Sequence, residues 1–199
     1  MIPLGYALLG LLARSPRSGY DLGRLMKEPI GFFWHAFPGQ IYPELARLEA
    51  AGLVIHERIE QEDRPDKKVF QITEDGRAAL RAWVTTPVHR VPDRDELMLK
   101  AYSVWLVDPM QAIPFFRRQE VYHLQRLAVY EAEEAELKLT SAAKLRQVQT
   151  PEFASYATLR RGMDYERSYA AWCRWMAETL EQAAEPPKEP PKEPGLSDP

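Results

Sequence analysis

Apolar residues near the start of the chain are grouped into short stretches separated by polar residues, glycine and proline. Residues 6–13 form a compact apolar stretch that predicts a helix, which Pro16 ends. Residues 18–21 have the form of a helix cap, because the Ser18 hydroxyl can accept a hydrogen bond from the amide three residues on. The second predicted helix carries apolar side chains at helical spacing: Leu22, Leu25 and Met26.

A third helix with one apolar face is predicted to start near residues 39–40. Its inward-facing side chains should be Ile41, Leu45 and Leu48, which follow each other at i, i+4 and i+7. Pro43 is expected in the first turn, where its missing amide would be unpaired in any case. Gly52 should end the helix with a left-handed turn. The side chains expected to face outward are Gln40, Tyr42, Glu44 and Arg47.

Alternating residues then predict two strands and a fourth helix. Leu53, Ile55 and Ile59 alternate with polar residues, as in a half-buried strand. Residues 62–66 form a turn by their proline and aspartates, and residues 69–72 return as a second strand. Thr73 should cap a helix that carries Ala78, Leu80, Trp83 and Val84. The order helix, strand, turn, strand, helix is that of a winged helix-turn-helix.

The rest of the chain predicts helices only. Asp93 can cap one helix, Asp108-Pro109 begins a long one that runs to about Leu145, and a last helix covers about 152–184. A repeated Pro-Pro-Lys-Glu unit then predicts an extended, solvated tail. We therefore expect a mainly α protein with a small β wing. Its parts are a winged helix-turn-helix domain at 1–88, an all-α dimerisation and possible effector domain at 93–184, and a Pro-rich disordered tail at 185–199.

Small and apolar residues on the two long helices predict a surface for a second copy of the chain. A winged helix reads few base pairs, so two copies on a twofold axis would read two half-sites. The alternative is that both helices pack only within one chain. The residues expected at the dimer contact are Val121, Leu124, Ala128, Ala132, Leu159, Met163, Trp172 and Met176.

Composition narrows the function classes. The net charge is −3, with 12 Lys and Arg against 11 Asp and Glu in residues 1–92 and 14 against 18 in residues 93–199. This mild asymmetry permits a local basic patch but does not by itself argue for nucleic-acid binding. Cys173 is the single cysteine and the four histidines are scattered, so we expect no disulfide, metal site or cofactor. Without a signal peptide or membrane span, the expected location is the cytoplasm.

The outward side chains of the third helix suit the major groove of DNA, which admits one helix. Gln40 can pair with adenine, Tyr42 can reach a phosphate or a thymine methyl, and Arg47 can reach guanine or phosphate. The alternative is that this face of the third helix and the charged turn between the two strands are simply exposed to solvent and bind no DNA. The full set of expected DNA-binding residues adds the start of the second helix and the wing: Ser18, Tyr20, Gln40, Tyr42, Pro43, Arg47, Arg64, Lys67 and Lys68.

These residues carry a resemblance to the PadR family of bacterial transcriptional regulators. The family's Gly-Tyr-acidic-Leu signature stands at residues 19–22, and its wing motif ends on Ile72-Thr73 and Gly76. Phe70 replaces the tyrosine common in the family. The recognition-helix pattern is met by Gly39, Tyr42, Pro43, Leu45, Arg47, Leu48, Glu49, Gly52 and Leu53. The resemblance implies a homodimeric repressor that binds a palindromic operator, and some members of the family respond to phenolic acids or drugs.

Aromatic residues of the C-terminal half could line a pocket for a flat aromatic effector, with Arg117, Arg118 or His123 available for a carboxylate. The candidates are Tyr102, Trp105, Phe116 and Trp175, although such rings more often pack a core or an interface. An enzyme is disfavoured because no nucleophile–base pair or phosphate-binding glycine loop is present. The remaining alternative is a winged-helix protein-interaction adaptor without DNA binding.

Overall fold

The computed structural model describes residues 1–27, 34, 37–60, 67–88 and 94–184. The chain divides into two compact units, Met1–Val91 and Pro92–Pro199. Arg64, Asp93 and the predicted Pro-rich tail lie outside the described residues.

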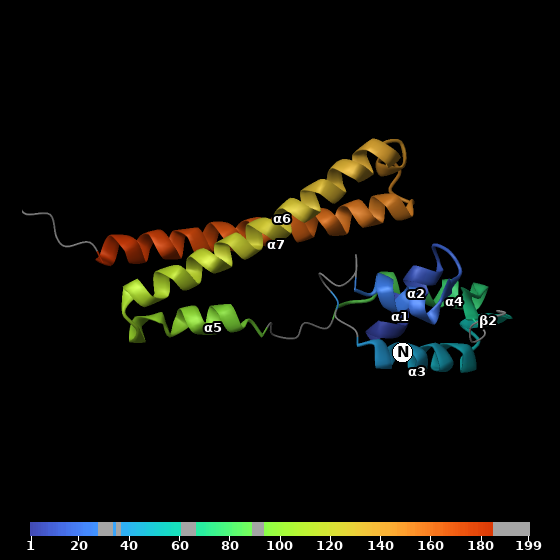
Figure 1. Cartoon of the computed structure of the whole chain (residues 1–199). Coiled ribbons are helices and arrows are strands. Elements are labelled where there is room, and N and C mark those ends of the chain that lie inside the picture. The colour runs from blue at the N-terminus through green and yellow to red at the C-terminus, as the bar shows by residue number, and fades with distance from the viewer. Residues whose placement is uncertain (28–33, 35–36, 61–66, 89–93, 185–199) are drawn as a thin grey trace, which may run out of the picture. The chain divides into compact units, whose positions relative to one another are not determined.

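The first unit combines four helices and a small antiparallel sheet within the described residues (Figure 1). In the sheet, β3 lies between β1 and β2. The helix, strand, strand, helix order from α3 to α4 is the one that the sequence predicts. The elements are α1 (Pro3–Leu12), β1 (Arg17–Ser18), α2 (Gly19–Leu25), α3 (Pro38–Ala50), β2 (Val54–Ile59), β3 (Lys67–Ile72) and α4 (Glu74–Val84).

The core of the first unit explains why α3 is held rigidly. Ile41, Leu45 and Leu48 are buried, as predicted, against leucines of α1 and α2. Gly52 has a φ of +71°, and the Leu53 amide donates to the Leu48 carbonyl, so α3 ends in the predicted left-handed turn. The Thr73 hydroxyl accepts from the Gly76 amide at 3.0 Å, which caps α4 as expected.

Three local predictions for this unit are wrong. In β2 the buried residue is Val54, while Ile55 is 56% exposed and Ile59 is also exposed. Val54 pairs with Ile72 of β3, and this register turns its side chain towards the core. Pro43 lies inside α3, beyond its first turn, because the helix already begins at Pro38. Glu44, expected to face outward, is buried.

The second unit is helical within the described residues. Asp95 caps α5 through the Met98 amide. The helix α6 ends at Ser141, four residues before the predicted end. It packs along α7 as an antiparallel hairpin (Figure 1). The elements are α5 (Glu96–Tyr102), the 3₁₀ turn η2 (Val104–Leu106), α6 (Pro109–Ser141), the 3₁₀ turn η3 (Lys144–Arg146) and α7 (Pro151–Ala184).

The face of α6 that packs on α7 is a different one from that of Val121, Leu124, Ala128 and Ala132, which the sequence assigns to the dimer contact. Its buried residues are Ala112, Phe116, Glu120, His123, Leu127 and Tyr130. The carboxylates there are paired across the hairpin: Glu120 accepts from Arg174 at 2.6 Å, and Glu166 of α7 accepts from Arg126 at 2.7 Å. In the described part of the chain, no helix has the length and apolar character needed to cross a membrane.

Candidate nucleic-acid interface

The outer face of α3 carries the first candidate site. Tyr42 is 56% exposed, and Pro43, Ala46 and Arg47 are exposed on the same side of the helix. The opposite side is the buried Ile41, Leu45 and Leu48 row, so the core fixes which side chains point outward. Tyr42, Pro43 and Arg47 therefore lie where the sequence places them.

Arg47 is attached only loosely to its own helix. Its Nη1 atom lies 3.4 Å from Oε2 of Glu44, and its side chain is mostly exposed while that of Glu44 is buried. The contact uses a single nitrogen at a long distance, so the other guanidinium N–H groups of Arg47 can donate to a phosphate or a guanine edge while Glu44 keeps its partner.

The Gln40 side chain helps to cap the N-terminus of α3. Its side-chain oxygen accepts a hydrogen bond from the Phe37 amide at 3.1 Å. A bidentate pair with adenine needs that oxygen as an acceptor together with the side-chain NH₂ as a donor. The bond from the Phe37 amide occupies one of the two lone pairs of that oxygen and restrains the side chain at the start of α3, so a pair with adenine must use an orientation compatible with this cap.

Tyr42 is positioned by a glycine of the neighbouring helix. A Cβ atom added at Gly19 would lie 2.5 Å from Cε1 and 3.0 Å from the hydroxyl oxygen of Tyr42. Such distances are far below van der Waals contact, so only glycine leaves room for the ring there. Sequence reasoning did not find this contact.

The start of α2 differs from expectation in one respect. The Ser18 side chain is buried, and its hydroxyl donates to Asp21 at 2.7 Å while accepting from the Asp21 amide. The hydroxyl is thus used within the cap and is not presented outward. Tyr20, in contrast, is 75% exposed. The Ser18 hydroxyl, with further help from Lys67, lowers the pKa of Asp21 against the opposing effect of burial.

Of the predicted wing residues, one forms an ion pair with α2 and another is exposed to solvent. Lys67 Nζ lies 3.3 Å from the Asp21 carboxylate, so β3 is tied to α2. Lys68 is exposed on the same strand, and Arg64 lies outside the described residues. His56 of β2 contacts Glu49 near the end of α3, which ties the wing to that helix. Among the described residues outside α3, the expected DNA-binding side chains that are exposed are thus Tyr20, Lys67 and Lys68, with Lys67 held by Asp21.

The predicted dimer residues divide into an exposed set on α6 and a packed set on α7. Val121, Leu124, Ala128 and Ala132 are exposed along α6. Leu159 and Met163 of α7 are buried within the chain, and Trp172 and Met176 pack against the Phe116 cluster. These last four residues are therefore part of the intrachain packing. The alternative that both helices pack only within one chain thus agrees with the structure for the α7 residues, whereas the four α6 residues are exposed.

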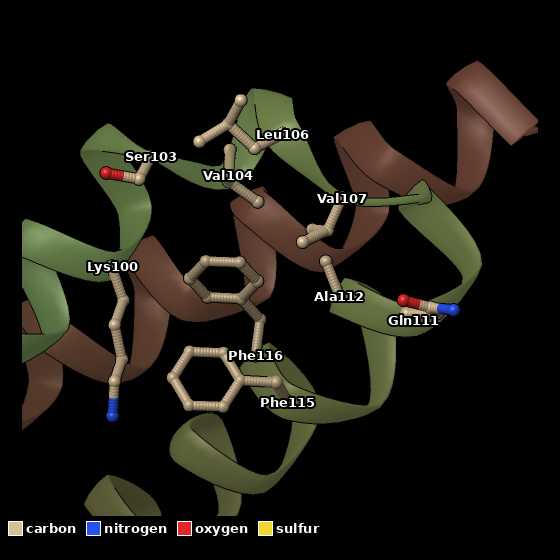
Figure 2. Close-up of a pocket in the computed structure, with 9 residues that line it drawn as sticks. All are labelled: Lys100, Ser103, Val104, Leu106, Val107, Gln111, Ala112, Phe115 and Phe116. Atoms are coloured by element: carbon tan, nitrogen blue, oxygen red, sulfur yellow. The ribbon is translucent and has the colours of Figure 1, made fainter.

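The predicted effector residues differ in their exposure to solvent. Tyr102, Trp105 and Trp175 are largely exposed, whereas Phe116 is buried. Of the suggested carboxylate partners, Arg117 is bound to Glu181 at 2.8 Å and His123 to Glu166 at 2.6 Å. Phe116 does line a cavity, together with residues that the sequence reasoning missed, among them Lys100 and Phe115 (Figure 2).

Comparison with known proteins assigns the chain to a family. The model described as "Transcriptional regulator PadR-like family" matches residues 8–82, and the one described as "Virulence activator alpha C-term" matches residues 94–181. The "Negative transcriptional regulator PadR" of Bacillus subtilis (strain 168) is 32% identical over 172 residues, which cover 85% of this chain and 92% of that protein. The chain belongs to the PadR family of transcriptional regulators.

Solved structures of the Bacillus subtilis PadR protein share the fold. Its complex with operator DNA has a TM-score of 0.80 and 29% identity, covering 90% of this chain and 98% of that one. Its complex with p-coumaric acid has a TM-score of 0.72 and 29% identity, covering 89% and 98%. The predicted PadR resemblance and the predicted winged-helix fold with a helical C-terminal region are both confirmed.

Proposed function

We propose that this PadR-family regulator binds double-stranded operator DNA as a homodimer, with α3 as the recognition helix, and that a small-molecule effector relieves repression. The observation that carries the DNA-binding part is the placement of Tyr42, Pro43 and Arg47 on one exposed face of a helix whose other face is buried. A structural relative with operator DNA supports it. Repression is supported by the name of the Bacillus subtilis relative.

The homodimer is supported by the unused side of α6. Val121 and Leu124 are exposed although α6 already packs its other side on α7, and Ala128 and Ala132 continue the same stripe. A twofold axis would present two recognition helices to half-sites about 34–36 Å apart. That geometry is the physical reason to expect a palindromic operator.

Operator binding is tested by fluorescence anisotropy with duplexes tiled across the DNA upstream of the chain's own coding sequence. We expect Tyr42→Ala and Arg47→Ala each to weaken binding by about 1–3 kcal/mol without lowering the melting temperature. Arg81→Ala is the matched control, because Arg81 is an exposed arginine of the same unit on α4. Binding by the unchanged protein should weaken steeply with salt, because DNA-bound cations are released. A protein-interaction adaptor would show no such salt-dependent binding.

The dimer is tested by analytical ultracentrifugation at micromolar concentration. We expect the unchanged protein to sediment as a dimer and Leu124→Glu to shift it towards monomer, because a charge would enter an apolar contact. Val148→Glu, an exposed valine near η3, should leave the dimer intact. A monomer at every concentration would reject the homodimer.

A further inference from the structure

The carboxylate of Asp21 joins the wing to the start of α2. Its Oδ2 atom accepts a hydrogen bond from the Ser18 hydroxyl at 2.7 Å and lies 3.3 Å from Nζ of Lys67, the first residue of β3. The backbone brings these residues together, because β1 pairs with β3 and places Ser18 opposite Val69. One carboxylate oxygen thus contacts both the cap of α2 and the wing strand.

The negative charge of Asp21 stays in this position whether or not Lys67 moves away. Asp21 lies in the first turn of α2, where the helix dipole favours a carboxylate, and the buried Ser18 hydroxyl holds it there. The Ser18 hydroxyl and, to a smaller extent, Lys67 lower the pKa of Asp21 against the effect of burial, so the group is ionised at neutral pH. A phosphate that approaches the Lys67 ammonium therefore also meets a carboxylate beside it.

The next residue, Lys68, has different surroundings. Consecutive side chains of a strand leave from opposite faces, so Lys68 does not share the face on which Lys67 meets Asp21. Lys68 is exposed and lies opposite Arg58 of β2 in the register, so two cationic residues are neighbours there. The two lysines at the start of β3 therefore provide a comparison between a lysine beside an acid and a lysine beside a cation.

We propose that Asp21 holds Lys67 away from the DNA backbone and so limits the affinity of the regulator for unrelated DNA. Lys67 then connects β3 to α2, and Lys68 supplies the phosphate contact of this strand. Binding to unrelated DNA depends almost wholly on phosphate contacts, whereas an operator is also read through base edges by α3. A carboxylate that withholds one lysine from phosphate therefore weakens the binding of unrelated DNA more than that of the operator. This inference rests on the proposed function, because it presupposes DNA binding.

The test measures fluorescence anisotropy of the full chain with an operator duplex and a scrambled duplex of equal length, at about 50–200 mM salt. Asp21→Asn should strengthen binding to the scrambled duplex about fivefold and steepen the dependence of log K on log salt by about 0.9, because the released Lys67 displaces one more counterion. The operator should gain less. In a Lys67→Met background the same change should strengthen binding by less than about twofold. Asp21→Glu keeps the carboxylate and should leave the affinity and the salt dependence as they are.

Asp75→Asn is the matched control. Asp75 is an exposed acid in the first turn of α4, which also follows a hydroxyl cap, so the change removes the same charge from the same unit. It should alter binding to the scrambled duplex by less than about twofold. Lys67→Met alone should reduce the salt dependence by less than about 0.5, and Lys68→Met by about 0.9. This comparison of lysines changes nothing at Asp21, so it decides the inference even where Asp21→Asn does not fold.

Three results would overturn the inference. Folded Asp21→Asn could bind the scrambled duplex no more tightly than the unchanged protein. Its gain could be equal in the Lys67→Met background or equalled by Asp75→Asn, which would make it an effect of net charge. Lys67→Met could reduce the salt dependence as much as Lys68→Met does. If the unchanged protein binds neither duplex, the proposed function fails, whereas any of these three results in a protein that binds DNA rejects this inference alone.

Discussion

At the scale of single residues, the contact between Gly19 and Tyr42 decides where the recognition tyrosine can point. The ring of Tyr42 occupies the space that any side chain at position 19 would need. Because the ring is the far end of a side chain that can rotate, a methyl group there would displace Tyr42 without unfolding α2. Gly19 is therefore a positioning residue for the proposed DNA contact.

Gly19→Ala should weaken operator binding about tenfold, or ~1.4 kcal/mol, while the melting temperature stays unchanged or rises, because alanine favours a helix. In a Tyr42→Ala background the same change should alter affinity by less than about twofold, since the displaced ring is gone. Gly23→Ala is the control on the same helix, where an added Cβ would lie at an ordinary 3.4 Å from Ile41. Equal losses in both backgrounds would show that Gly19 acts independently of Tyr42.

At the scale of elements, local signals in the sequence predict the buried face of α3 and its C-terminal end well. The spacing of Ile41, Leu45 and Leu48 selects one buried face, Gly52 marks the end and Thr73 marks the next start. Each of these signals acts within one or two helical turns, so no tertiary information is needed to interpret it. The exposed positions of Tyr42 and Arg47 follow directly from that buried face.

The wrong predictions concern residues whose burial depends on the strand or helix that packs against them. Val54 and Ile55 are adjacent and both apolar, and only the register with β3 selects Val54 for the core. On α6 apolar residues occur on several sides, and the side that packs on α7 includes Glu120 and His123, which a hydrophobic pattern cannot mark. Those polar groups are buried because partners on α7 satisfy them.

The same limit applies to the candidate sites. The hydrogen bond from the Phe37 amide to Gln40 and the pairing of Lys67 with Asp21 join residues that sequence reasoning treated separately. The pocket lined by Lys100, Val107 and Phe115 needs α5 to fold back along α6. The sequence indicated an aromatic-rich C-terminal half, but the rings that it named are mostly exposed.

At the scale of the whole molecule, α3 and the pocket belong to different compact units. Ligand binding and DNA binding can therefore be measured separately, and any effect of one on the other is a coupling free energy that must be reciprocal. The hairpin of α6 and α7 carries the exposed residues proposed for the dimer contact, so its own geometry decides how they are presented. Its register is fixed by ion pairs between α6 and α7, of which the most enclosed involve Glu120 and Glu166.

Glu120 makes the hairpin sensitive to acid. Burial raises the pKa of Glu120, but Arg174 and Arg117 outweigh it and hold that pKa below its ordinary value of 4.5. The stabilisation is therefore complete above about pH 4.5 and is lost as the pH falls through the lowered pKa. Glu120→Gln should lower the free energy of unfolding in urea by about 1.5–3 kcal/mol at pH 7, with a smaller difference at pH 3. Glu131→Gln, at an exposed pair with Arg167, should have a much smaller effect. A loss for Glu120→Gln that does not change with pH would show that shape, not charge, is what the position requires.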